Sequence, residues 1–245
     1  MSKKSYRKIF IPGWAIETKH YQKIVDSVEI LKECEVASFG YFKEQIAKRQ
    51  FKLDLNNPAQ QINDYVDNDS TIVFCHSLGS IYTLQAALLN ENIKAVIVFS
   101  GFAKFAEDVK CWEFGQNVRA LRAMKMMLRK NAKGLIENFY KNCATPKSNN
   151  FVIPENFDKK LLQEGLEQLI ELDIRENLTK IRVPVIFIHG DEDQICRCEV
   201  ARDSQKIIDN SVNSEFHSIS GTGHNLLFDS IEKWQKIVQD FVEKI

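Results

Sequence analysis

Apolar residues in this chain recur in short runs, and longer segments with mixed polar and apolar residues separate them. Several runs are continuous and rich in β-branched residues, which is typical of strands buried on both faces of a parallel sheet. The segments between them repeat apolar residues every three or four positions, as helices do. The pattern predicts strands at residues 9–11, 36–39, 71–74, 95–99, 185–188 and 214–219, and helices at 21–31, 58–66, 81–89 and 230–245. Alternating strands and helices indicate an α/β fold with a mostly parallel sheet and helices on both faces.

The alternation stops after residue 101 and resumes at residue 180. Residues 102–179 keep a helical periodicity, contain no convincing strand and hold two prolines in a polar loop. We therefore expect a core formed by residues 1–101 and 180–245, with residues 102–179 inserted as a helical lid. Ligands of open α/β sheets bind at the carboxyl ends of the strands. We expect the lid to lie over that edge.

Composition and charge exclude several classes of function. The 245 residues are 44% hydrophobic, and 33 Lys and Arg residues balance 33 Asp and Glu residues. The chain therefore has no overall field that attracts nucleic acid or a membrane surface, and its longest apolar run is too short to span a bilayer. The basic N-terminal residues run directly into the first predicted strand, so we expect no secretory leader. We expect a cytoplasmic monomer that needs no cofactor.

The six cysteines form neither a disulfide framework nor a zinc-binding pattern. Cys196 and Cys198 are the one close pair, and no second pair completes a tetrahedral site. We expect reduced thiols and no metal.

The most informative motif follows the predicted strand at 71–74. There Cys75-x-Ser77-x-Gly79 leads directly into a predicted helix. A nucleophile elbow is built in this way, because a sharp turn between strand and helix presents one hydroxyl. Cys75 stands where the elbow usually has its first glycine, and we interpret it as a small buried filler. An ordinary strand-to-helix turn would give the same motif. Whether Ser77 is catalytic therefore depends on whether the rest of the chain supplies a base and an acid.

A serine nucleophile needs a base, and the base needs an orienting carboxylate. Asp191 and Asp193 follow a predicted buried strand, and we favour Asp193 because it is far enough past the strand to turn back. Asp191 would then cap or solvate the turn. Of five histidines, only His224 lies in a glycine-containing loop after the last predicted strand, whereas His20 looks like a surface residue. Ser77, Asp193 and His224 thus all follow strands on the same side of the sheet.

An acyl-transfer site also needs backbone N–H donors for the oxyanion of its tetrahedral intermediate. We expect one from Leu78, directly after the serine. The second is expected from Trp14, because Gly13 lets the loop after the first strand approach closely. The alternative role for Trp14 is a core aromatic residue, which would still leave its amide available.

These motifs resemble the α/β-hydrolase superfamily over nearly the whole chain. The resemblance rests on Gly13-Trp14, Ser77-Leu78-Gly79, Gly190-x-x-Asp193 and Gly223-His224. Within the superfamily the chain is most similar to pimeloyl-acyl-carrier-protein methyl ester esterases, through Gly165-Leu166-Glu167-x-Leu169, Leu172-Asp173-x-Arg175-x-x-Leu178 and Phe139. The resemblance implies a carboxylesterase of biotin biosynthesis, which cleaves a methyl ester while the acyl chain is thioester-linked to acyl carrier protein. It implies that Phe139 faces the acyl chain.

The carrier is acidic, so the resemblance also implies a basic lid. Residues 117–133 contain no Asp or Glu, and their basic residues fall in one sector of a helical wheel. These residues are Arg119, Arg122, Lys125, Arg129, Lys130 and Lys133, opposite Leu121, Met124, Met127 and Leu128. A solvated helix face, the alternative, normally interleaves both signs. The lid arginines of the family fall at Gly134 and Asn138 here, so the docking pose is expected to differ.

Three other functions fit the same motifs. A general short-chain carboxylesterase or thioesterase would use the same triad, with the basic lid incidental. A lyase would use the triad as a proton shuttle without forming an acyl-enzyme. A non-enzymatic interaction protein on this scaffold would show a broken triad, whereas all three members are present here.

Overall fold

The computed structural model describes residues 6–42, 49–108, 110–147, 151–208 and 213–245. Its strands form one parallel sheet in the order β3-β2-β1-β4-β5-β6-β7. The strands are β1 (Arg7–Ile11), β2 (Glu35–Ser38), β3 (Gln50–Lys52), β4 (Thr71–His76), β5 (Ile93–Phe99), β6 (Val185–Gly190) and β7 (Ser214–Ile219). The sheet confirms the predicted α/β fold with a parallel sheet.

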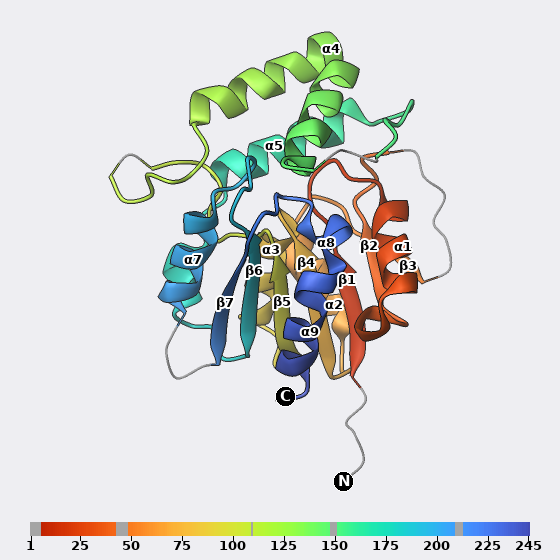
Figure 1. Cartoon of the computed structure of the whole chain (residues 1–245), viewed down its shortest axis with the longest axis vertical. Coiled ribbons are helices and arrows are strands. Elements are labelled where there is room, and N and C mark those ends of the chain that lie inside the picture. The colour runs from red at the N-terminus through yellow and green to blue at the C-terminus, as the bar shows by residue number, and fades with distance from the viewer. Residues whose placement is uncertain (1–5, 43–48, 109, 148–150, 209–212) are drawn as a thin grey trace.

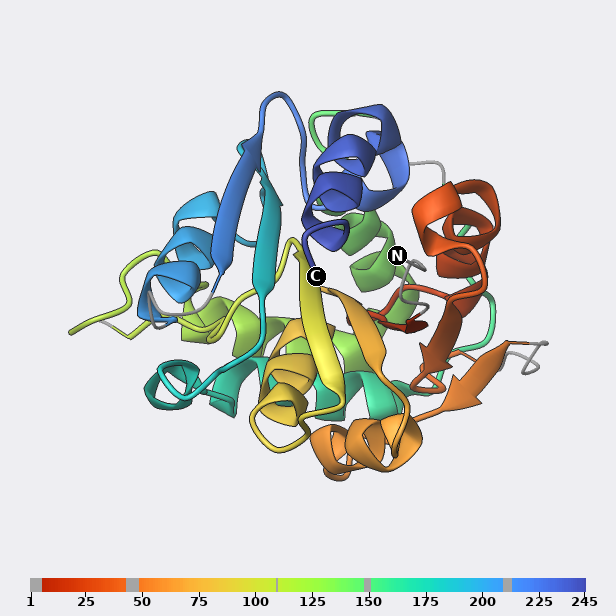
Figure 2. The same ribbon diagram turned by 90° about the horizontal axis from the view of Figure 1, so that it is seen from below.

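Helices cover both faces of this sheet. Figure 2 shows α1 and α9 on one face and α2 and α3 on the other. The helices outside the insertion are α1 (Thr18–Ser27), α2 (Pro58–Val66), α3 (Gly79–Ala87), α7 (Cys198–Ile207), α8 (Leu226–Asp229) and α9 (Ile231–Val242), and a 3-10 turn spans Glu29–Leu31. The central strands β4 and β6 are buried along their whole length, which explains their continuous apolar sequence. No helix among the described residues is long and apolar enough to cross a bilayer.

The segment between β5 and β6 contains α4 (Val118–Ala144), α5 (Lys159–Glu171) and α6 (Arg175–Leu178). Helices α4 and α5 lie over the carboxyl ends of the strands (Figure 1). Helix α4 bends at Asn131, whose backbone leaves the helical region (φ −148°, ψ 73°). The Asn131 side chain accepts a hydrogen bond from the Gly134 amide at 3.0 Å and so starts a second helical half. The helical wheel drawn from the sequence through residue 133 was therefore wrong beyond this bend.

Candidate active site

Ser77 occupies a strained turn at the end of β4. Its φ is +52°, in the left-handed region that residues other than glycine rarely adopt. The Ser77 amide donates to the Phe99 carbonyl of β5 at 3.0 Å, which fixes the turn to the neighbouring strand. A Cβ added at Gly79 would lie 2.5 Å from the Ile11 carbonyl oxygen, so α3 begins directly against the end of β1. The local sequence thus builds an elbow that holds the serine at the centre of the sheet edge.

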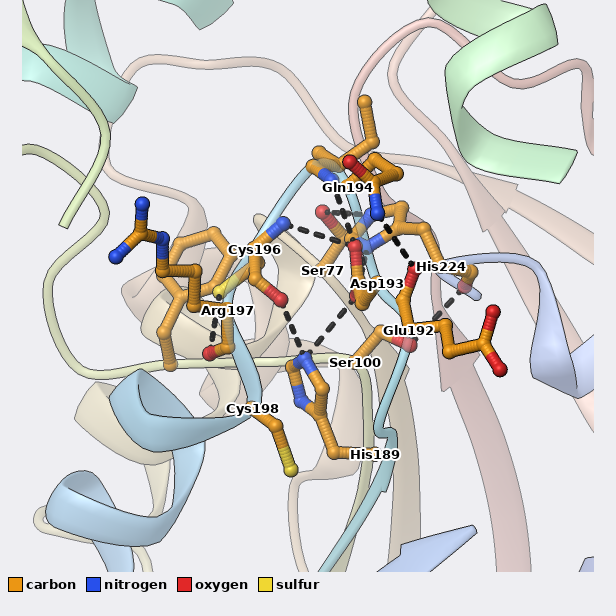
Figure 3. Close-up of polar contacts among 12 residues, drawn as sticks. Ser77, Ser100, His189, Glu192, Asp193, Gln194, Cys196, Arg197, Cys198 and His224 are labelled. Carbon is orange, nitrogen blue, oxygen red and sulfur yellow. Dashed lines mark hydrogen bonds and ion pairs between the residues drawn. The ribbon is translucent and has the colours of Figure 1, made fainter. Parts of the chain in front are cut away.

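The structure joins Ser77, His224 and Asp193 in one chain of hydrogen bonds (Figure 3). His224 Nε2 lies 3.0 Å from Ser77 Oγ, and His224 Nδ1 lies 2.7 Å from Asp193 Oδ2. The Asp193 Oδ1 atom accepts hydrogen bonds from the amides of Ile195 and Cys196 at 2.8 and 2.9 Å. Ser77 and Asp193 are each 7% exposed, and His224 is fully buried. Water therefore competes little with these contacts.

The charge of Asp193 follows from its neighbours. Burial raises the pKa of a carboxyl, but the imidazoles of His224 and His189 outweigh burial and hold the pKa of Asp193 well below its ordinary 3.8. An ionised Asp193 requires a proton on His224 Nδ1, which leaves Nε2 free to accept the Ser77 proton. Asp191, the other candidate for the acid of the triad, is exposed and accepts a hydrogen bond from the Gly221 amide at 2.8 Å. Its carboxylate therefore stabilises the turn that contains Gly221.

Two amides beside Ser77 can stabilise an oxyanion. Gly13 brings its loop against the elbow, since an added Cβ there would lie 2.9 Å from Ser77 Cβ. Among the described residues, the backbone N–H groups of Trp14 and Leu78 have no hydrogen-bond partner. The Trp14 indole is buried and donates to the Leu162 carbonyl at 2.9 Å. Both roles weighed for Trp14 are thus compatible, because the indole packs while the amide stays available.

Ser77 opens into a cavity of about 150 Å³ between the core and the insertion. Most of its lining is apolar, and none of its described lining residues carries a charge. The apolar lining includes Trp14, Phe105, Leu121, Met124, Leu135, Phe139, Leu166, Leu169 and Ile195, and the polar side chains are Gln116, Asn138, Asn142 and Gln194. Phe139 packs edge-on against Trp14, with 4.9 Å between ring centroids. The cavity suits an uncharged, partly apolar ligand.

The predicted basic residues lie on α4 outside this cavity. Four of them line one surface groove together with Glu167: Arg119, Arg122, Lys125 and Arg129. Lys125 forms an ion pair with Glu167 of α5. Lys130 and Lys133 are exposed, and Lys133 follows the bend at Asn131, so it does not belong to the same straight helix face. Met127, placed opposite the charges by the sequence, is 43% exposed.

Two further histidines, which the sequence placed at strand ends without a role, are buried beside the triad. His76 donates from Nε2 to the His224 carbonyl at 3.1 Å and accepts at Nδ1 from the Tyr21 hydroxyl, 2.9 Å away. Burial and the nearby His224 lower the pKa of His76 to about 3, so it is neutral. The second, His189, contacts Asp193. Both follow apolar strand residues, and that position was the one available signal.

The described cysteines are all unpaired, and burial raises the pKa of the Cys75 thiol. Cys75 is fully buried, as expected of a small filler. Within the described ranges, His, Cys, Asp and Glu side chains form no group of three that could hold a metal ion.

Comparison with known proteins identifies the class. The sequence profile of a hydrolase family described as serine aminopeptidase, S33, matches residues 47–231, so the chain belongs to this family. It is therefore a serine hydrolase with an α/β-hydrolase fold, as its sequence predicted.

Individual relatives resemble the chain at low identity. Pimeloyl-[acyl-carrier protein] methyl ester esterase of Vibrio vulnificus is 22% identical over 215 residues, covering 82% of this chain and 81% of the relative. The enzyme of the same name from Wigglesworthia glossinidia brevipalpis is 21% identical, with 98% and 95% covered. Among solved structures, an esterase from Exiguobacterium antarcticum superposes with a TM-score of 0.78 at 18% identity, covering 98% of this chain and 92% of that one. These relatives place the chain among serine hydrolases related to esterases.

Proposed function

We propose that this chain is a serine carboxylesterase that hydrolyses the methyl ester of pimeloyl-acyl-carrier protein, a step of biotin biosynthesis. The observation that carries the chemistry is the buried chain from Ser77 through His224 to Asp193, open to an uncharged cavity. The names of two relatives that match over most of their length support the substrate.

The reaction proceeds through an acyl-enzyme. Ser77 Oγ attacks the ester carbonyl carbon while His224 Nε2 takes its proton, and Asp193 stabilises the imidazolium that forms. The carbonyl oxygen becomes an oxyanion and receives the N–H groups of Trp14 and Leu78. The carbon–oxygen bond to the methoxy group breaks, and His224 returns the proton to release methanol. Water, deprotonated by His224, then attacks the acyl-enzyme, and Ser77 recovers its proton as the acid leaves.

The cavity supports a neutral ester as substrate. Trp14 and Phe139 supply an aromatic wall for an acyl chain. A free carboxylate in this cavity would meet no cationic side chain among the lining residues, and burying an unpaired charge is costly. The methyl ester therefore fits better than the acid that its hydrolysis produces, which favours product release.

We propose that residues 1–101 and 180–245 act as the core and residues 102–179 as a lid that docks the carrier. Three arginines of the lid groove, Arg119, Arg122 and Arg129, have no carboxylate within ion-pair distance among the described residues. Met126, in the same groove, is 62% exposed. Positive charge next to exposed apolar surface suits an acidic protein with an apolar contact face.

The test compares methyl pimeloyl-acyl-carrier protein with the same methyl ester lacking its carrier. We expect the wild type to demethylate the carrier-bound ester much faster, and Ser77→Ala to be inactive with an unchanged circular dichroism spectrum. Equal rates on both esters would agree with a serine hydrolase but would contradict a role for the carrier protein in substrate recognition. Activity that survives in Ser77→Ala would refute the acyl-enzyme mechanism.

The second candidate is a general short-chain carboxylesterase or thioesterase, which the small cavity of about 150 Å³ favours. Faster hydrolysis of short esters or thioesters than of the carrier-bound ester would select it. Product analysis separates both candidates from a lyase, because hydrolysis yields an acid and an alcohol or thiol.

A further inference from the structure

His189 stands at the end of β6, fully buried, and contacts the acid of the triad from the side opposite His224 (Figure 3). His189 Nε2 lies 2.8 Å from the Cys196 carbonyl oxygen and 3.0 Å from Asp193 Oδ2. A carbonyl oxygen accepts hydrogen bonds only, so His189 Nε2 must carry a proton. His189 Nδ1 is buried and has no partner among the described residues. The described structure therefore offers no acceptor for a proton on Nδ1.

We propose that His189 is a positioning residue that fixes the Asp193 carboxylate and shares its negative charge with His224. This role rests on the proposed function of the triad. Both imidazoles contact the same atom, Asp193 Oδ2, while backbone amides hold Oδ1. The carboxylate is thus held at both oxygens and cannot rotate without losing contacts.

His189 acts on His224 through the Asp193 carboxylate. Without the His189 contact, no second imidazole holds Asp193 Oδ2, and the carboxylate orients the His224 ring less firmly. We expect proton transfer from Ser77 to slow, because it depends on the position of His224 Nε2.

The test measures kcat and KM for hydrolysis of p-nitrophenyl butyrate. We expect His189→Leu to lower kcat about tenfold, with KM within twofold. His189→Gln restores an N–H donor and should bring kcat back. His217→Leu is the matched control, because it removes a half-buried histidine whose side chain bonds only Glu215 within the described structure. An unchanged kcat in folded His189→Leu would overturn the proposal, and so would a failure of His189→Gln to restore it.

Nitrogen-15 NMR of the wild-type imidazoles keeps the proposal testable if His189→Leu does not fold. We expect a proton on Nε2 of His189. A ring that carries its proton on Nδ1 instead would overturn the proposal. This measurement does not depend on enzyme activity. An inactive wild type would contradict the proposed function, whereas the NMR result would still test the contact of His189 with Asp193.

Discussion

Asp193→Asn replaces one oxygen of the triad carboxylate by an NH2 group. Two backbone amides, those of Ile195 and Cys196, point at Oδ1, so the remaining oxygen has to stay on that side. The new NH2 group then faces His224 Nδ1 and the N–H of His189. It can bond His224 only if Nδ1 is unprotonated, which moves the imidazole proton to Nε2. That tautomer directs an N–H at Ser77 and cannot take its proton.

We expect kcat of Asp193→Asn to fall by about 10⁴, the size of effect that a wrong tautomer produces in other Ser-His-Asp enzymes. This loss corresponds to about 5 kcal/mol of transition-state stabilisation. Substrate binding does not use Asp193, so KM should change by less than about threefold. The assay is hydrolysis of p-nitrophenyl butyrate at pH 7.5, with Ser77→Ala setting the background.

Asp191→Asn is the matched control for this variant. Its carboxylate bonds only the Gly221 amide within the described structure, and an asparagine oxygen can accept that bond. We expect its kcat to stay within about twofold of the wild type. A loss below tenfold in Asp193→Asn, or a larger loss in Asp191→Asn, would refute the assignment of the acid.

Three further predictions address stability, pH and the lid. Gly79→Ala should lower the free energy of unfolding in urea by about 1–3 kcal/mol, because its Cβ would lie 2.5 Å from the Ile11 carbonyl oxygen; an unchanged midpoint would contradict this. The pKa of His76 is about 3 in the folded chain and 6.5 when unperturbed, so the unfolded chain binds its proton first as pH falls. As pH falls between those two values, the contribution of His76 to the free energy of unfolding should drop by about 1.4 kcal/mol per pH unit. Urea titrations at several pH values should show this slope in the wild type and not in His76→Gln. Reversing charge in Arg119→Glu/Arg122→Glu should lower the ratio of rates on carrier-bound and carrier-free ester about tenfold at low salt, and an unchanged ratio would contradict carrier docking.

The sequence predicted the sheet well because its central strands are buried on both faces and consist mostly of apolar residues. The turn after β4, the acid after β6 and the histidine after β7 were found because each follows a strand directly. Parallel strands bring their carboxyl ends to one edge, so chain order alone put Ser77, Asp193 and His224 together. The contacts among these side chains depended on the structure.

Other features of the fold could not be predicted, because the sequence pattern was too short or because they depend on contacts with distant segments. Strand β3 has three residues at the sheet edge and was missed, as was α7. His20 looked like a surface residue, yet it is buried and stacks on Phe151, with 4.0 Å between ring centroids. A residue from a distant segment covers it, which periodicity within α1 cannot reveal. The bend at Asn131 depends on one side chain that competes for a backbone amide.

The loop that carries His224 is fastened to the far end of α4. The Asn225 amide donates to the Cys143 carbonyl at 3.0 Å, and a Cβ added at Gly223 would lie 1.8 Å from the Thr145 carbonyl oxygen. Residues 132–144 therefore cannot swing away without disturbing the base. Residues 118–130 lie beyond the bend at Asn131 and do not share this attachment. We therefore expect amide hydrogen exchange to be faster there than in residues 132–144, so that any opening of the cavity starts in the arginine-bearing half and leaves the catalytic geometry assembled.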